Sequence, residues 1–141
     1  MKRIVLISCA SKKLPRIARA RHLYISPLFQ LNLQYAQCQA PDAIYILSAK
    51  YGLLHLDDEV APYNVTLNDM TASQRRAWAN QVLEQLSQRA DLQKDEFIFL
   101  AGQRYREHLI PRIAHCEVPM EGLSIGKQLR ALKRLIDEHC L

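Results

Sequence analysis

The sequence predicts an α/β protein: a small, mostly parallel sheet with helices on both faces. Three short apolar runs, rich in β-branched and aromatic residues, have the length of buried strands and cover residues 3–7, 43–47 and 97–101. The segments between them place apolar residues at helical spacing and begin with capping residues. Because strands that alternate with helices form parallel sheets, we expect these three strands at the centre of the sheet.

The chain has 141 residues, which predicts one α/β domain over residues 1–141 with a substantial core. Its formal net charge of +5 favours a partner that carries phosphates. No apolar run approaches the roughly 20 residues that a transmembrane helix needs. The N-terminus reads as a first strand and not as a signal peptide, so we expect a cytoplasmic protein with no membrane partner.

The cysteines are Cys9, Cys38, Cys116 and Cys140. None of them forms a C-x-x-C pair, so neither a zinc ribbon nor a redox motif is indicated. In a reducing compartment we expect free thiols and no disulfides. The adjacent pairs His115-Cys116 and His139-Cys140 would point to opposite faces of a strand, so no metal site is expected. Phosphate-loop and dinucleotide motifs are absent as well, and no cofactor is expected.

The first strand runs into Ser8–Lys13, a small, polar and basic segment. Residues 14–25 read as a long basic loop. Ser26-Pro27 is a strong helix start, because serine can cap free N–H groups and proline fits the first turn. This helix is expected to reach about Cys38.

The second strand runs into Ser48–Gly52 and then into an acidic turn, Asp57-Asp58-Glu59, which Pro62-Tyr63-Asn64 closes. Ligands of α/β proteins bind beyond the carboxyl ends of parallel strands, so this layout indicates a site. An ordinary strand–loop connection is the alternative. Residues 60–70 read as a surface excursion.

The remaining elements follow from capping and turn signals. Thr71 and Gln74 have the form of a capping box, and Ser124 can cap a final helix. Proline disrupts a helix and removes a hydrogen-bond donor from a strand, so Pro111 should shorten one helix and Pro119 should confine one strand to the sheet edge. The predicted set is a helix over residues 72–89, the strand at 97–101, a helix from 103 that Pro111 shortens, an edge strand at 117–119, and a helix from 125.

The carboxyl ends of the three strands should deliver polar side chains to one edge. Lysines can neutralise phosphate, hydroxyls can position it, and tyrosines can stack on an unpaired base. The predicted binding residues are Ser8, Cys9, Ser11, Lys12, Tyr24, Ser26, Lys50, Tyr51, Gly52, Tyr63, Asn64, Gly102 and Tyr105.

Asp58, with Asp57 beside it, is the candidate catalytic group. A carboxylate next to phosphate-binding cations weakens binding and so suggests a chemical role. It can stabilise an oxocarbenium-like sugar or orient a water for attack at the anomeric carbon. The alternative is a solvated turn, or a turn paired with Lys50 or an arginine.

Two segments resemble known families. Leu47–Leu54, with Asp58 and Pro62-Tyr63, resembles the signature of the peroxide stress protein YaaA family. Ser8–Lys13 with Leu23–Phe29 looks more like a family of small bacterial proteins of unassigned function, and this likeness covers nearly the whole chain. The Ser8–Lys13 segment is also similar to the uracil-DNA-glycosylase-like domain of archaeosine tRNA-modifying enzymes.

These resemblances imply a uracil-DNA-glycosylase-like fold and DNA binding linked to stress response or repair. We therefore expect a nucleic-acid base N-glycosylase, a hydrolase that acts on damaged or modified DNA, with DNA favoured over RNA. The G-Q-D-P-Y and H-P-S segments of ordinary uracil-DNA glycosylases are absent, so the catalytic residues would differ. The alternatives are a non-catalytic DNA-binding protein of stress protection and an enzyme that processes free nucleosides or nucleotides.

Overall fold

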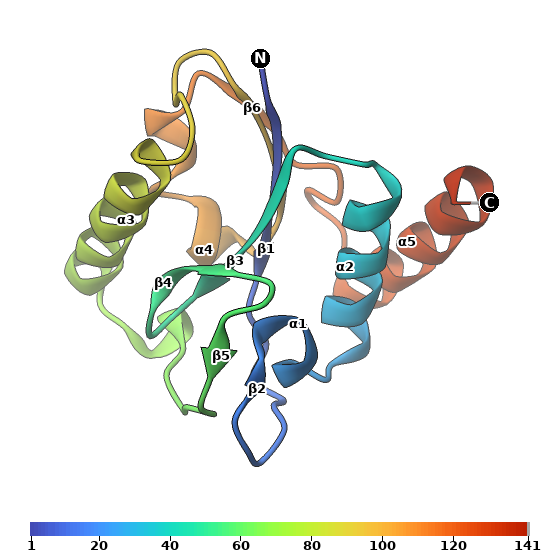
Figure 1. The fold of residues 1–141 in the computed structure, drawn as a ribbon, viewed down its shortest axis with the longest axis horizontal. Coiled ribbons are helices and arrows are strands. Elements are labelled where there is room, and N and C mark those ends of the chain that lie inside the picture. The colour runs from blue at the N-terminus through green and yellow to red at the C-terminus, as the bar shows by residue number, and fades with distance from the viewer. Residues whose placement is uncertain (141) are drawn as a thin grey trace.

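A computed structural model describes residues 1–140 and confirms an α/β architecture with a five-stranded, mostly parallel sheet (Figure 1). The central strand β1 (Arg3–Ser8) pairs in parallel with β3 (Ala43–Ser48) and with β6 (Glu96–Leu100). β7 (His115–Glu117) lies parallel to β6, and β4 (Gly52–His55) lies antiparallel to β3. The three predicted strands are therefore the three neighbours at the centre of the sheet.

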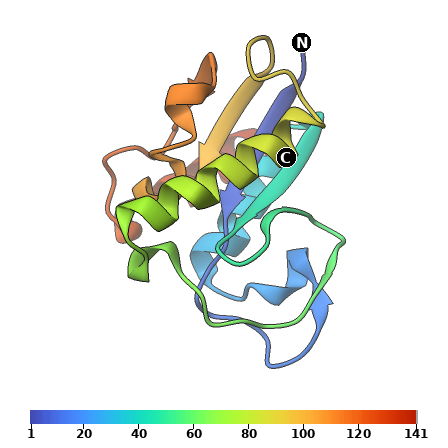
Figure 2. The same ribbon diagram turned by 90° about the vertical axis from the view of Figure 1, so that its left-hand side faces the viewer.

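Helices cover both faces of this sheet, as predicted. α2 (Pro27–Cys38) and α5 (Ile125–His139) lie on one face, and α3 (Ala72–Ser87) with the single turn α4 (Gln103–Arg106) lies on the other (Figure 1). Figure 2 shows α3 crossing the sheet. Alternate side chains of β1 supply the two cores, because successive residues of a strand point to opposite faces. Ile4 and Leu6 pack toward α3, whereas Val5 and Ile7 pack toward α2 and α5.

The three main helices begin where the capping signals place them. Ser26 Oγ accepts a hydrogen bond from the Phe29 N–H at 3.2 Å, and Ser124 Oγ accepts one from the Lys127 N–H. Thr71 and Gln74 form the predicted capping box. Each cap satisfies an N–H group that the first helical turn leaves without a partner. Within residues 1–140, no helix combines the length and the apolar character that a membrane span requires.

Several short elements differ from the sequence-based expectation. Residues 14–25, expected to be a loop, contain β2 (Ala18–Arg19) and α1 (Ala20–Leu23), and β2 pairs with β5 (Glu59–Val60). β4 was not predicted, because its four residues are too few to show a period. The expected edge strand at 117–119 ends at Glu117 instead, before Val118-Pro119. The 3₁₀ turns η1 (Leu67–Asp69) and η2 (Ile110–Arg112) complete the fold.

The expectation of no disulfides is wrong, because Cys38 and Cys140 form one. Cys38 is the last residue of α2 and Cys140 directly follows α5. These two helices pack side by side, so their ends bring the cysteines to a Cα–Cα separation of 5.4 Å, inside the usual range. The sequence separation of 102 residues hides this proximity. Cys9 and Cys116 remain free.

Loss of this disulfide should destabilise the protein. Cross-linking residues far apart in the chain lowers the entropy of the unfolded state, and such bonds contribute about 2–4 kcal/mol. We expect Cys38→Ser to lower the free energy of unfolding by about that amount in denaturant titrations. Cys116→Ser is the matched control and should change it far less. Equal stabilities for Cys38→Ser and the oxidised wild type would contradict this assignment.

Candidate functional site

A cavity of about 340 Å³ opens at the carboxyl ends of β1 and β6. Ser8 ends β1, and Gly102 and Tyr105 follow β6, so three of the predicted binding residues meet in its wall. The remaining wall comes from the end of β6 and from α2, α4, α5 and η1. We call it the amide cavity, because four side-chain amides line it, those of Asn32, Asn68, Gln103 and Gln128.

A second cavity, of about 160 Å³, lies beside Cys9 and is called the Cys9 cavity. It brings together Cys9, Ser11 and Asn64, all three predicted, with Lys13 and Thr66. Tyr105 and Asn68 line both cavities and so form their common wall. Cys9 and Ser11 thus lie in one wall with Asn64 and Tyr105, whereas Lys50, Tyr51 and Gly52, which follow the second predicted strand, line neither cavity.

Tyr105 is held rigidly in this common wall. Its hydroxyl accepts a hydrogen bond from the Leu67 N–H at 3.4 Å and lies 3.6 Å from the Cys9 thiol. Its ring packs edge-on against Trp78, with the ring centroids 5.7 Å apart. Burial, and next the neighbouring Cys9, raise the pKa of Tyr105 to about 12. The side chain thus presents a neutral hydroxyl at neutral pH.

The predicted tyrosines Tyr24 and Tyr63 form a buried hydrogen-bonded pair instead of open stacking faces. Their hydroxyl oxygens are 2.6 Å apart, and Ser48 Oγ donates to Tyr63 at 2.8 Å. Tyr24 is fully buried, so it offers no ring face to a base. Burial holds the pKa of both phenols far above the usual range. Tyr51 stays 37% exposed, with Lys50 Nζ 5.3 Å from the centroid of its ring.

Lys13 supplies a cation to the Cys9 cavity. Its Nζ lies 4.3 Å from the centroid of the Tyr63 ring, which fixes the ammonium by a cation–π contact. Partial burial lowers the pKa of Lys13. Lys12, predicted as a binder, and Lys50 have exposed side chains.

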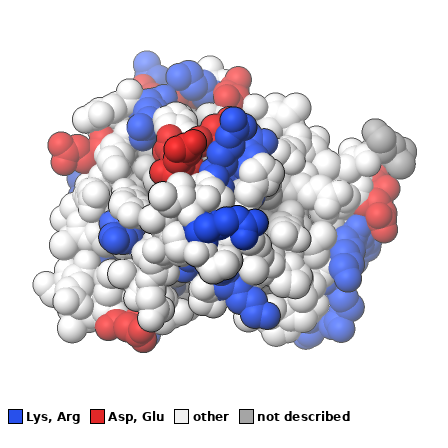
Figure 3. Space-filling view, turned by 60° about the horizontal axis from the view of Figure 1, so that its bottom comes forward, with Lys and Arg blue, Asp and Glu red and all other residues white. Residues whose placement is uncertain are grey.

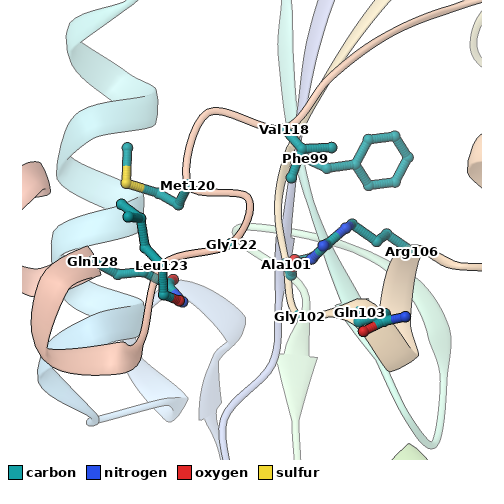
Figure 4. A pocket seen from close by; sticks show the side chains of 10 residues that line it. All are labelled: Phe99, Ala101, Gly102, Gln103, Arg106, Val118, Met120, Gly122, Leu123 and Gln128. Carbon is teal, nitrogen blue, oxygen red and sulfur yellow. Dashed lines mark hydrogen bonds between the residues drawn. The ribbon is translucent and has the colours of Figure 1, made fainter.

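A third cavity, of about 250 Å³, adjoins the amide cavity through Gly102, Gln103 and Gln128, which line both (Figure 4). Figure 4 shows Arg106 on one side and Leu123 and Gln128 on the other. The Arg106 guanidinium donates to the Ala101 carbonyl at 2.7 Å and is thereby fixed at this end of the edge.

The predicted catalytic aspartates lie apart from these cavities, since neither lines the amide cavity or the Cys9 cavity. The Asp57 carboxylate lies 2.9 Å from Arg21 Nε, which matches the alternative interpretation of an arginine-paired turn. Asp58 Oδ2 accepts a hydrogen bond from the His55 N–H at 2.9 Å. The Asp58 carbonyl accepts another from the Ala20 N–H, so α1 anchors the acidic turn.

Two further predicted residues have structural roles. Ser26 caps α2 through its hydroxyl. Gly52 adopts a φ of 75°, a left-handed conformation that favours glycine, and an added Cβ would collide with Gln85 Oε1. That oxygen also accepts a hydrogen bond from the Leu53 N–H, which ties α3 to the start of β4.

The Asn32, Asn68 and Gln128 amides of the amide cavity were not predicted. Asn32 gives the clearest signal in the sequence, because it lies among Phe29, Tyr35 and Ala36 on the apolar face of α2. A polar residue at such a position requires a partner or a ligand.

Basic side chains are distributed over the surface at this edge, with acidic groups between them (Figure 3). A further run of basic residues follows α5 at the right of the same view. Its members are Lys127, Arg130, Lys133 and Arg134, all exposed.

Residues 4–134 match the model of a family of unknown function, DUF6884. The chain belongs to this family, which confirms the expected membership of a family of unassigned function. No curated protein matches the chain.

The Tyr24–Tyr63–Ser48 cluster should stabilise the edge. Tyr63→Phe removes the hydroxyl that both neighbours contact and leaves buried polar groups without a partner, at a cost of about 1–2 kcal/mol. Denaturant titration should show this loss. The control Tyr51→Phe alters a partly exposed tyrosine and should stay within about 0.5 kcal/mol of wild type. Equal effects of the two variants would contradict a stabilising role for the cluster.

Proposed function

We propose that the carboxyl edge, the end of the sheet at which the parallel strands β1, β3 and β6 finish, binds an unstacked nucleotide of a nucleic acid. We further propose that the protein hydrolyses the N-glycosidic bond of that nucleotide. One observation carries this proposal: two cavities meet at Tyr105 and Asn68 and differ in chemistry. The amide cavity offers mainly neutral hydrogen-bonding groups, with one cation, Arg104, that faces Glu107, whereas the Cys9 cavity offers the cation Lys13 and hydroxyls. A nucleotide has the same division, between a neutral base and a charged phosphate.

The Cys9 cavity suits a phosphate. Lys13 can neutralise the charge, while Ser11 and Thr66 can donate hydrogen bonds to phosphate oxygens. The cation–π contact with Tyr63 fixes the lysine before a ligand arrives, so less side-chain entropy is lost on binding. The net charge of +5 favours the encounter with a polyanion.

In the proposed reaction, the bond between base and sugar breaks and the base leaves with the bonding electrons. A water adds to the anomeric carbon, gives up a proton, and the base gains one, so that free base and an abasic sugar result. Asp58 is the proposed group that stabilises the cationic sugar or orients the water. Of the two carboxylate oxygens of Asp58, only Oδ2 accepts a hydrogen bond within residues 1–140, which leaves Oδ1 available.

Non-catalytic binding of DNA, as in stress protection, is the second candidate. It is favoured by the ion pair of Asp57 with Arg21 and by the position of both aspartates outside the two cavities. The resemblance to the YaaA family supports DNA as the ligand in either case.

Base release from oligonucleotides that carry deaminated, oxidised or alkylated bases tests hydrolysis. We expect the wild type to release base and Asp58→Asn to lower the rate by on the order of a hundredfold, because general acid–base groups contribute that much. DNA affinity should persist in this variant. The control Glu59→Gln removes a neighbouring exposed charge and should leave the rate within about twofold.

Absence of base release by the wild type from the whole panel would reject hydrolysis. A salt titration of DNA binding then decides the second candidate, which predicts an affinity that falls steeply with salt and an Asp58→Asn variant that binds equally well or better. Absence of binding at low salt would reject both candidates.

A further inference from the structure

Asn32 is a buried polar residue without a partner. Only 5% of its surface is exposed, and its Oδ1 has no hydrogen-bond partner within residues 1–140. A buried polar atom that loses water and gains no hydrogen bond destabilises the fold, so such atoms are rare in proteins. A ligand that brings a donor would remove this defect.

The surroundings of Asn32 show where that ligand would lie. Asn32 lines the amide cavity, whose apolar wall includes Leu28, Leu100 and the exposed Ile125. Gln128, across the cavity on α5, uses its Nε2 to donate to the Leu123 carbonyl at 3.0 Å. Its Oε1 therefore remains an acceptor. Apolar walls with a few fixed amides suit a flat, neutral heterocycle better than an anion.

The size and the charge of the cavity agree with such a ligand. Its volume of about 340 Å³ lies within the range of small-molecule sites, which begins near 300 Å³. Arg104 is its only charged lining residue within the described part of the chain, and its guanidinium faces Glu107 at 4.0 Å. Lys13, the proposed phosphate-binding group, belongs to the Cys9 cavity, which shares Tyr105 and Asn68 with the amide cavity.

We propose that the amide cavity holds a nucleobase and that Asn32 recognises the edge of that base. The Asn32 amide places an acceptor and a donor side by side, and the hydrogen-bonding edges of nucleobases pair with this arrangement in two parallel bonds. Once a rotation of the Asn32 side chain exposes the buried Oδ1 to the cavity, a ring N–H or exocyclic amino group of the base would donate to Oδ1, and an adjacent acceptor would receive a bond from Nδ2. This inference names the base subsite of the proposed function and rests on it.

Binding of free bases to the whole protein tests the assignment. Uracil, cytosine, adenine and hypoxanthine are titrated in ligand-observed NMR. The base that binds best should lose about tenfold or more in affinity to Asn32→Leu, because a lost bidentate contact costs that much. Gln34→Leu, an exposed position on the same helix, should bind like wild type. An N-methylated analogue of that base, without the donor, should bind as weakly to wild type as the base does to Asn32→Leu.

Thermal unfolding of the same variants separates recognition from packing. Asn32→Leu replaces an unsatisfied buried amide with an apolar group of similar size. The unfolding temperature of the variant should therefore equal or exceed that of wild type. Gln128→Leu, on the opposite wall and half-exposed, should weaken base binding as well. It therefore tests the cavity even if Asn32→Leu fails to fold.

Unchanged base affinity in Asn32→Leu or in Gln128→Leu would overturn the assignment, as would the absence of binding of all four bases to wild type. Base binding that depends on Asn32, without base release from any oligonucleotide, would reject the proposed hydrolysis and keep the base subsite. Base release that is unaffected by Asn32→Leu would reject the base subsite at Asn32 and keep the proposed hydrolysis.

Discussion

Hydrogen bonding of β1 on both sides is the constraint on which the rest of the structure depends. Ser8 lies level with Leu47 of β3, and Ile7 lies level with Leu100 of β6. Since the strands are parallel and in this register, the chain leaves all of them at one edge. The Cys9 N–H extends the ladder by donating to the Leu47 carbonyl at 3.0 Å. A slip of one residue would turn every β1 side chain to the opposite face and dismantle the site.

The packing of α2 against α5 is the second requirement, because these helices form the outer wall of the amide cavity. Their apolar faces meet the β1 side chains Val5 and Ile7 in one core. The Cys38–Cys140 disulfide closes the pair at the ends of both helices, beyond Asn32 and Gln128. Stability and the proposed binding would thus be linked, because the two helices that pack together also carry two of the four amides, those of Asn32 and Gln128.

Local physical chemistry predicts much of this fold. Short β-branched runs specify the three central strands, and the side chains of Ser26, Thr71 and Ser124 specify where helices begin. The fold rule for parallel strands then places Ser8, Gly102 and Tyr105 together, and the structure brings them into one cavity wall. Each of these inferences needs only neighbouring residues or a general rule of topology.

Features that depend on packing between distant segments could not be predicted from local sequence patterns. Prediction of the disulfide requires the knowledge that α2 and α5 are neighbours. The burial of Tyr24 depends on how residues 14–25 fold over the sheet, and the pairing of Asp57 depends on where α1 places Arg21. Asn32 lies on the apolar face of α2, but only the packed core shows that its Oδ1 is buried without a hydrogen-bond partner. Among these residues, Tyr24, Asp57 and Asn32 bear on which chemistry the carboxyl edge can support.

Mapping of backbone amide shifts by NMR, during titration with a short single-stranded oligonucleotide, tests most directly that the carboxyl edge is a nucleotide site. A nucleotide site at this edge predicts the largest changes in residues 8–13, 64–68 and 101–105 and at Asn32. Changes confined to the opposite end of the sheet, around residues 87–95, or to the basic face of α5 would contradict it.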